Sequence, residues 1–215
     1  MRLEWDKTGE RLYETGVDRG VLYPFASGGT YGTGVPWNGL SAVNESPSGA
    51  EPTALYANNS KYVTLMSAEE LGLTIEAYTY PEEFEPCDGS SEISEGVIIG
   101  QQDREHFGFS YRSLIGNDES GNNHGYKLHL VYDCLASPAE KNRSTVNDSP
   151  DVSPFSWSVS TTPVSVDGHK PTSMLTLDST KIPAEKLAII EEKLYGTADA
   201  EPTLPLPNEI VELLK

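Results

Sequence analysis

Hydrophobic and polar residues alternate with a period of two in four separate parts of this chain. Successive side chains of a β-strand point to opposite faces, so such alternation predicts strands with one buried face. In the first part, Leu73, Ile75 and Ala77 alternate with Thr74 and Glu76. The four predicted strands span residues 71–80, 107–114, 126–135 and 155–161.

The second and third of these strands flank a loop rich in Gly and Asn. This loop, residues 116–125, joins residues 107–114 to residues 126–135 and therefore predicts a long antiparallel hairpin. The alternation along the return strand places Tyr132 and Cys134 on the same face of the sheet.

The fourth strand, residues 155–161, is followed by a turn signal at Asp167 and Gly168 and by an apolar segment at residues 174–177. This order predicts a second antiparallel pair. Gly- and Pro-rich loops separate further, shorter predicted strands at residues 19–23, 35–43 and 61–66.

One helix is predicted near the end of the chain, at residues 184–195. Pro183 is allowed in its first turn, Gly196 stops it, and its apolar stripe is Leu187, Ile190 and Leu194. Residues 203–207 are expected to be extended, and Asn208 is expected to cap a short last helix. The elements predict a sheet-based body with one docked helix.

Composition narrows the classes of protein that remain. The chain has 215 residues, with 15 Lys and Arg against 33 Asp and Glu, so its formal net charge is −18. Clamping nucleic acid needs basic residues that displace counterions, so this charge excludes such a protein. No apolar run approaches the roughly 20 residues that cross a bilayer, and no secretory signal is evident. We expect one mainly β domain over residues 1–215, made and kept in a cytoplasm, without a membrane segment.

Residue types that carry catalysis or bind metals show no suitable spacing. Glu82, Glu83, Glu85 and Asp88 share one turn, whereas the paired carboxylates of a glycosidase normally come from separate strands. The histidines are scattered without ligand spacing, and both cysteines, Cys87 and Cys134, are expected to be free thiols. We therefore expect no enzyme, no metal and no cofactor. The four histidines are His106, His124, His129 and His169.

The distribution of charge is more informative. Between Lys61 and Arg104 the chain has no basic residue but carries ten acidic ones. This run is either a solvated face that keeps the protein soluble or a surface that repels a polyanion, such as a channel wall past which DNA moves. The long hairpins also have open edges, which either close into a barrel within one chain or pair with neighbouring copies.

Many segments, in order along nearly the whole chain, resemble one family: the major tail tube protein of long-tailed, siphovirus-type bacteriophages and prophages of Gram-positive bacteria. The segments that carry the resemblance include GVDRGVLY at residues 16–23, VPWNGL at 35–40, ESPSGAEP at 45–52, EAYTYPEE at 76–83, GYKLHL at 125–130, TVNDSP at 145–150, LDST at 177–180, LYGT at 194–197 and LPLP at 204–207.

The resemblance implies a structural virion protein. In that family a β-sandwich or split barrel with one flanking helix assembles into homohexameric rings, and stacked rings form the tail tube whose lumen conducts viral DNA from capsid to host. It implies partners as well: further copies of the chain, tail tip or initiator proteins, the tape measure protein and the tail terminator. DNA passes through without specific binding, and the protein lies in the virion tail after assembly in the host cytoplasm.

Under this interpretation, residues 72–80 and 106–134 are candidates for strands of the tube wall, with the helix outside them. Strand alternation nominates Glu76 and Asp133 as carboxylates that face the lumen. Large aromatic residues contribute most at interfaces, which nominates four between residues 21 and 60 for contacts between stacked rings: Tyr23, Phe25, Trp37 and Tyr56. The alternatives are a secreted β-sandwich adhesin or a carbohydrate-binding module, which would remain monomeric, and a glycosidase.

Overall fold

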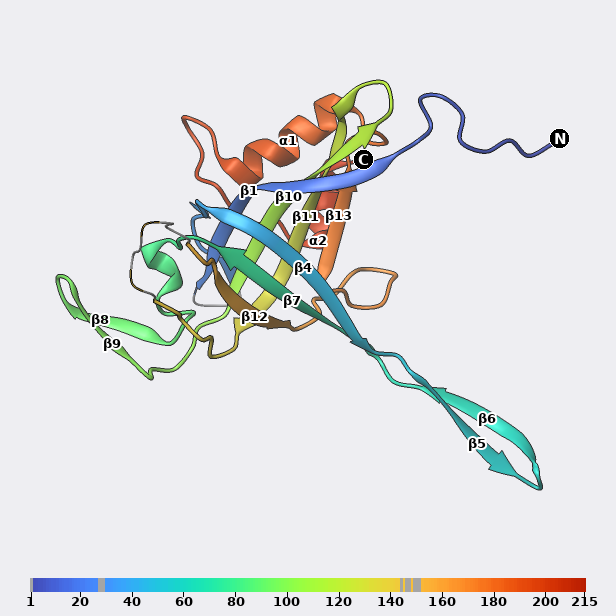
Figure 1. Cartoon of the computed structure of the whole chain (residues 1–215), viewed down its shortest axis with the longest axis horizontal. Coiled ribbons are helices and arrows are strands. Elements are labelled where there is room, and N and C mark those ends of the chain that lie inside the picture. The colour runs from blue at the N-terminus through green and yellow to red at the C-terminus, as the bar shows by residue number, and fades with distance from the viewer. Residues whose placement is uncertain (1, 27–29, 144, 146–147, 149–151) are drawn as a thin grey trace.

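A computed structural model describes residues 2–26, 30–143, 145, 148 and 152–215. The chain is mainly β, with 49% of residues in strands and 11% in helices, and consists of a large antiparallel sheet with two helices (Figure 1). This confirms the predicted class, a β-sandwich with a flanking helix.

The strands are β1 (Tyr13–Ala26), β2 (Thr30–Tyr31), β3 (Val35–Pro36), β4 (Leu40–Gly49), β5 (Pro52–Ala57), β6 (Ser60–Met66), β7 (Glu69–Ala77), β8 (Ser90–Ser94), β9 (Val97–Gly100), β10 (Phe107–Asn117), β11 (Gly121–Ala136), β12 (Phe155–Thr161) and β13 (Met174–Asp178). The helices are the short 3-10 helix η1 (Glu82–Phe84) and the α-helices α1 (Ala184–Tyr195) and α2 (Pro207–Leu213).

Among the described residues, nine strands form one antiparallel sheet in the order β2-β1-β10-β11-β12-β7-β4, with β13 also on β11 and β3 also on β1. Strand β11 holds the sheet together because its length lets it pair with three neighbours: β10 along one edge, and β13 and β12 along successive parts of the other. No strand pairing within the described residues joins β4 back to β2, so the sheet stays open at both ends.

The predicted hairpin of β10 and β11 is confirmed, but its loop is shorter than expected. Strand β10 continues to Asn117 and β11 begins at Gly121, so the turn comprises residues 118–120. The side chain of Asn117 closes this turn by accepting hydrogen bonds from the backbone N–H groups of Glu119 and Ser120, at 3.2 and 2.6 Å. Because these hydrogen bonds stabilise a tight turn, the hairpin needs no longer loop.

The expected alternation fails near the end of β11. The register with β10 shifts between Phe109, which faces Val131, and Phe107, which faces Cys134, so β11 has one extra residue there. Asp133 has a φ of +47°, a left-handed conformation that accompanies this bulge. Tyr132 and Cys134 therefore pack into different core clusters rather than on one face, which corrects the prediction.

The predicted pairing of residues 155–161 with residues 174–177 is also wrong. Strand β12 pairs with β7 and, at its end, with β11, whereas β13 pairs with β11. The chain does turn back near Asp167 and Gly168, where an isolated antiparallel bridge joins Val164 and Thr172. The reason is burial, because Trp157 and Val159 of β12 pack into the cluster that contains Ile75 of β7.

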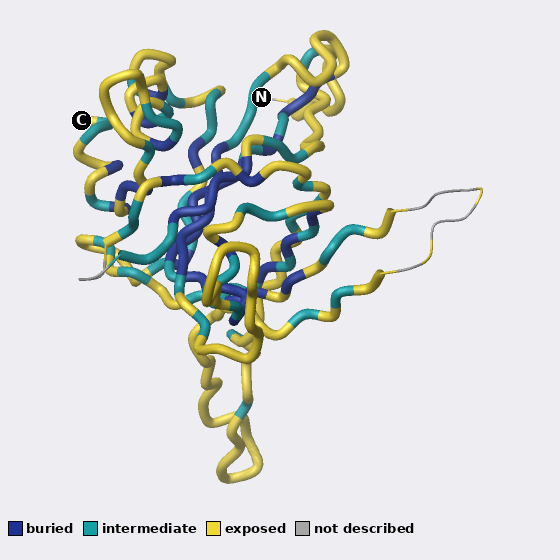
Figure 2. Tube along the Cα trace, turned by 90° about the vertical axis from the view of Figure 1, so that its left-hand side faces the viewer, coloured by how far each residue is buried: buried dark blue, intermediate teal, exposed yellow. Residues whose placement is uncertain are grey.

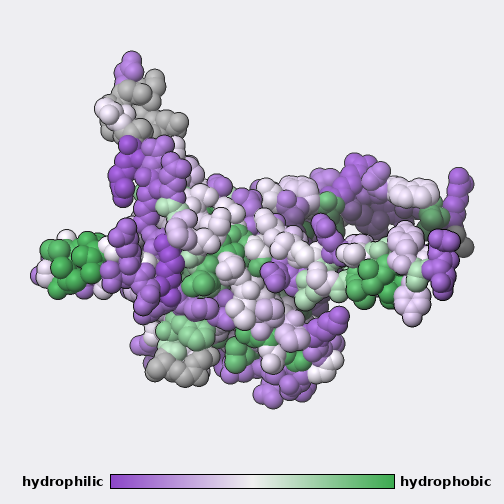
Figure 3. Space-filling model, turned by 90° about the horizontal axis from the view of Figure 1, so that it is seen from below, coloured by the Kyte–Doolittle hydropathy of each residue, from purple (hydrophilic) through white to green (hydrophobic). Residues whose placement is uncertain are grey.

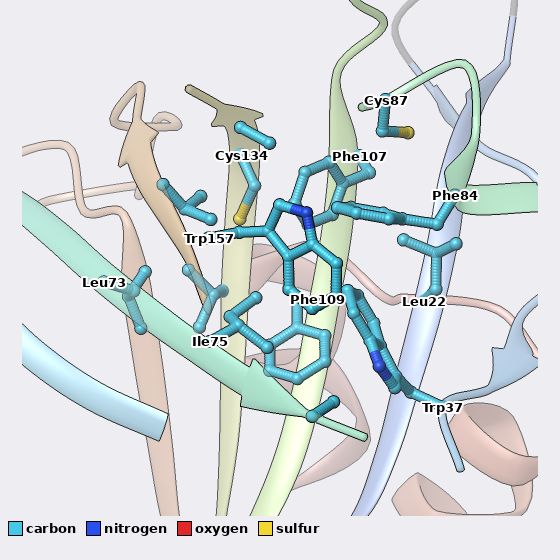
Figure 4. Packing of buried hydrophobic residues seen from close by; sticks show 14 of the residues in the cluster. Leu22, Trp37, Leu73, Ile75, Phe84, Cys87, Phe107, Phe109, Cys134 and Trp157 are labelled. Atoms are coloured by element: carbon cyan, nitrogen blue, oxygen red, sulfur yellow. The ribbon is translucent and has the colours of Figure 1, made fainter. Parts of the chain in front are cut away.

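Two hydrophobic clusters fill the part of the molecule that the structure describes, one on each side of β10 and β11. The first is aromatic and lies between β1, β10, β12 and β7 (Figure 4). Trp157 lies in it with ring centroids 5.3 Å from Phe84 and 5.7 Å from Trp37. Cys87 and Cys134 are buried here as free thiols, and burial raises the pKa of Cys87 to about 12.

The second cluster lies under α1. Leu187, Ile190 and Leu194 are its buried residues in this helix, as the stripe predicts, and α1 has the predicted bounds. Helix α2 begins at Pro207, and no side chain among the described residues caps it. The Asn208 side chain instead accepts the backbone N–H of Asp167 at 3.0 Å, so its predicted capping role is wrong.

Among the described residues, no helix is both long and apolar enough to cross a membrane.

Candidate functional site

The β5–β6 hairpin projects far from the body of the molecule (Figures 1 and 2). Asn58 and Asn59 form its two-residue turn, with φ values of +50° and +61°, the conformation that a type I′ hairpin requires. Every residue of β6 is exposed. Its large exposed apolar residues, with those of β5, are Leu55, Tyr56, Tyr62, Val63, Leu65 and Met66.

A second hairpin, β8–β9, projects from the opposite side of the body (Figure 1). Its turn contains Gly96, with φ +75°, and the Gly96 N–H donates to Glu92 Oε1 at 2.7 Å. Four aliphatic residues of this hairpin are exposed: Ile93, Val97, Ile98 and Ile99. The hairpin borders a cleft of about 660 Å³, and five of the residues that line it are glutamates: Glu82, Glu83, Glu85, Glu92 and Glu95.

A polar cluster lies between β1, β4, β10 and β11. The His129 ring stacks on Tyr111 with a centroid distance of 4.5 Å and an interplanar angle of 8°. His129 Nε2 lies 2.9 Å from Ser113 Oγ, and the two ring nitrogens lie 3.7 and 3.8 Å from carboxylate oxygens of Glu14 and Glu45. Burial lowers the pKa of His129, although both carboxylates act in the opposite direction.

Because of this cluster, we expect the free energy of unfolding of the protein to decrease as the pH falls below about 6.5, the ordinary pKa of histidine. The unfolded chain then binds a proton at His129 that the native protein does not bind, so acidification favours unfolding. The variant His129→Gln should flatten the dependence of unfolding free energy on pH by at most about 1.4 kcal/mol per pH unit, the limit for one proton. Urea unfolding of both proteins between about pH 5 and pH 8 measures the difference.

Effects on the unfolding free energy that are common to the parent protein and His129→Gln cancel when the two are compared. Protonation of surface carboxylates changes the self-repulsion of both chains equally. Burial raises the pKa of Glu14, but hydrogen bonds from Lys127 and Ser113 lower it overall, so the stability that Glu14 contributes is lost only below the ordinary glutamate pKa of 4.5. Equal slopes for the variant and the parent protein would contradict the role given to His129.

The structure brings together two residues that the sequence nominated for different roles. Asp133 Oδ1 lies 2.6 Å from His106 Nδ1, and the His106 ring lies 6.1 Å from the Phe25 ring. Phe25 and Asp133 thus line one shallow cleft of about 500 Å³, together with Ala26, Glu105 and His106. Asp133 is therefore paired and partly covered in the single chain rather than freely exposed.

The other nominated residues fall into two groups. Tyr56 lies on the β5–β6 hairpin and is 72% exposed, and Glu76 is partly exposed on β7, on the face opposite Ile75. Tyr23 and Trp37 are buried instead. The Tyr23 hydroxyl donates to the Leu194 carbonyl at 2.8 Å, and the Trp37 indole N–H donates to the Thr79 carbonyl at 3.0 Å. Because both side chains are buried within the chain, they do not fit the predicted contacts between stacked rings of subunits.

Sequence reasoning missed the hairpin strands β5, β8 and β9 and the polar cluster around His129. The Asn58–Asn59 dipeptide was a hairpin signal for β5. No comparable signal exists for the cluster, because its residues come from four strands. Within the described part of the chain, no group of three His, Cys, Asp or Glu residues has the geometry of a metal site.

Comparisons with known proteins give little help. No family model matches the chain, and no curated protein matches it. Among solved structures, it is similar to the sheath/tube terminator of an extracellular contractile injection system, PVC, seen in the extended state by cryo-EM. That alignment has a TM-score of 0.33 and 9% sequence identity, and covers 82% of this chain and 99% of the terminator chain. A similarity this low carries no argument about function.

Proposed function

We propose that this protein is a structural subunit that self-assembles into stacked hexameric rings, forming a phage tail tube through which viral DNA passes. The observation that carries the proposal is the pair of projecting hairpins, β5–β6 and β8–β9, whose large apolar residues are exposed in the single chain. Exposed apolar patches of this kind mark sites of protein association.

The architecture of the hairpins supports association. A two-stranded hairpin is marginally stable in water when it stands alone, so packing against another molecule stabilises it. The open sheet adds unpaired strand edges, which are templates for pairing with further chains. Assembly would therefore both stabilise the projecting hairpins and pair the open edges of the sheet.

The charge of the chain supports the passage of DNA. With a formal net charge of −18, the protein repels phosphate, and a tube wall without rings of basic residues lets a polyanion move without binding.

The resemblance of the sequence to major tail tube proteins supports the hexameric ring in particular. Further tail proteins, namely the initiator at the tip, the tape measure and the terminator, are then its partners in the virion. The role is structural and involves no catalysis or cofactor.

Negative-stain electron microscopy of the concentrated protein, combined with sedimentation velocity, tests the proposal. We expect stacked rings with a central channel, formed by the protein alone or after addition of tail-tip complexes. A strictly monomeric species that fails to polymerise even with tail-tip complexes would overturn the proposal and favour a monomeric binding module.

A further inference from the structure

We propose that the β5–β6 hairpin of one copy binds the β8–β9 hairpin and the adjoining acidic cleft of the next copy. This inference rests on the self-assembly proposed above and names the two surfaces that meet. Here the β5–β6 hairpin denotes residues 52–66, and the acidic cleft denotes the space lined by Glu82, Glu83, Glu85, Glu92 and Glu95.

Both surfaces are apolar and lie at the two ends of the molecule. Figure 3 shows hydrophobic side chains gathered at each end, over β8–β9 on one side and over β5–β6 on the other. On β5–β6 the exposed groups are largely aromatic or long, including Tyr62 and Met66, whereas on β8–β9 they are aliphatic, including Ile93 and Ile98. Burying one against the other removes both from water.

Charge favours this pairing over a contact between two identical surfaces. Lys61 is the one charged residue between positions 52 and 66, so the β5–β6 hairpin carries a positive charge on a strongly acidic protein. The acidic cleft carries five carboxylates, and no Lys or Arg is among the described residues that line it. Lys61 of another copy can supply the missing cation.

The directions of the hairpins make the contact intermolecular. The two hairpins extend away from each other on opposite sides of the body (Figure 1), so one chain cannot bring its own pair together. Each is a separate two-stranded sheet in the described structure, with free edges that can add strands. A contact between two different surfaces of identical copies is heterologous, and it builds rings or open stacks rather than closed dimers.

A mixing experiment tests the pairing. In one variant, Asn-Gly replaces residues 51–66, so that a loop of five residues joins Gly49 to Glu69, which are already paired and can close a shorter hairpin. In the other, the same dipeptide replaces residues 91–99 as a two-residue turn between the paired Ser90 and Gly100. Each variant keeps one binding surface. We expect each alone to sediment as a monomer and the mixture to form a 1:1 complex that grows no further.

The outcomes separate this inference from the proposed function. If the parent protein forms stacked rings but the two variants do not combine, the hairpins bind elsewhere and only the inference fails. If the variant without residues 51–66 still assembles alone, the β5–β6 hairpin is not the donor surface. If the parent protein itself never assembles, the proposed function fails as well. Near-ultraviolet circular dichroism checks that both variants keep the packed aromatic core.

A charge exchange gives a second test that leaves both hairpins in place. The substitution Lys61→Glu should weaken association on the order of tenfold, because like charges then meet at the cleft. A second copy carrying Glu92→Lys and Glu95→Lys should restore association with this variant. Failure of the reversed pair to recover any affinity would overturn the assignment of Lys61 to the cleft.

Discussion

Replacing Trp157 by alanine is expected to lower the free energy of unfolding by about 3–5 kcal/mol. The Trp157 side chain is fully buried, and its ring contacts Trp37, Phe84 and Tyr80 at centroid distances of 5.7, 5.3 and 5.5 Å. Alanine leaves a cavity in the aromatic cluster between β1, β7, β10 and β12, and the surrounding rings cannot collapse into it without losing their edge-to-face packing. Urea unfolding followed by circular dichroism measures the loss.

Two further substitutions sharpen this prediction. Trp5→Ala removes an indole that is 77% exposed, and it should change the unfolding free energy by no more than about 0.5 kcal/mol. Trp157→Phe should cost less than Trp157→Ala, because it retains much of the packing and removes an indole Nε1 that has no hydrogen-bond partner in the described structure. A loss below about 1 kcal/mol for Trp157→Ala would show that this site is not the centre of the core.

The strand pattern of the body was predictable because one physical signal dominated it. Residues along β7 and β12 alternate between a buried and a less buried face, and the same period of two is present in the sequence. Helix α1 was predictable for the same reason, since its buried stripe has the period of a helix and Gly196 follows it.

Pairing partners and side-chain directions near irregularities were less predictable. A bulge at Asp133 reverses the face of the sheet on which later residues lie. Aspartate adopts a left-handed φ, here +47°, more often than most residues, but its presence in a strand does not by itself predict a bulge. Strand β12 follows β11 in the chain but pairs mainly with β7, because the burial of Trp157 outweighs the local turn near Gly168. Such choices are made by tertiary packing rather than by local sequence.

The candidate assembly surfaces were only partly predictable. Aromatic residues nominate interfaces and cores alike, so Tyr23 and Trp37 could not be distinguished from Tyr56 before their burial was known. The acidic run, in contrast, was visible directly in the sequence. Its position beside an exposed aliphatic hairpin required the structure.

The largest expected effect on function follows from adding a positive charge at Glu76. Tubes assembled from Glu76→Lys should retain duplex DNA at about 50 mM salt and release it as the salt concentration rises, because each neutralised phosphate releases a counterion. Glu76 lies on β7 with its side chain on the face opposite the core, so substitution there adds charge without disturbing packing. Repetition of the site around stacked rings multiplies a weak contact into a strong one. DNA protected from nuclease after assembly in its presence measures retention.

Glu185→Lys is the matched control for this variant. It changes the net charge by the same amount, but its position in the first turn of α1 places it on the helix that covers the second hydrophobic cluster, away from β7. If β7 lines the channel and α1 lies outside, tubes of Glu76→Lys protect DNA whereas those of Glu185→Lys and the parent protein do not. Equal protection by both variants would show that added charge alone binds DNA. Protection by neither, in tubes that assemble normally, would exclude Glu76 from the channel wall and leave Asp133 as the nominated carboxylate still to be tested.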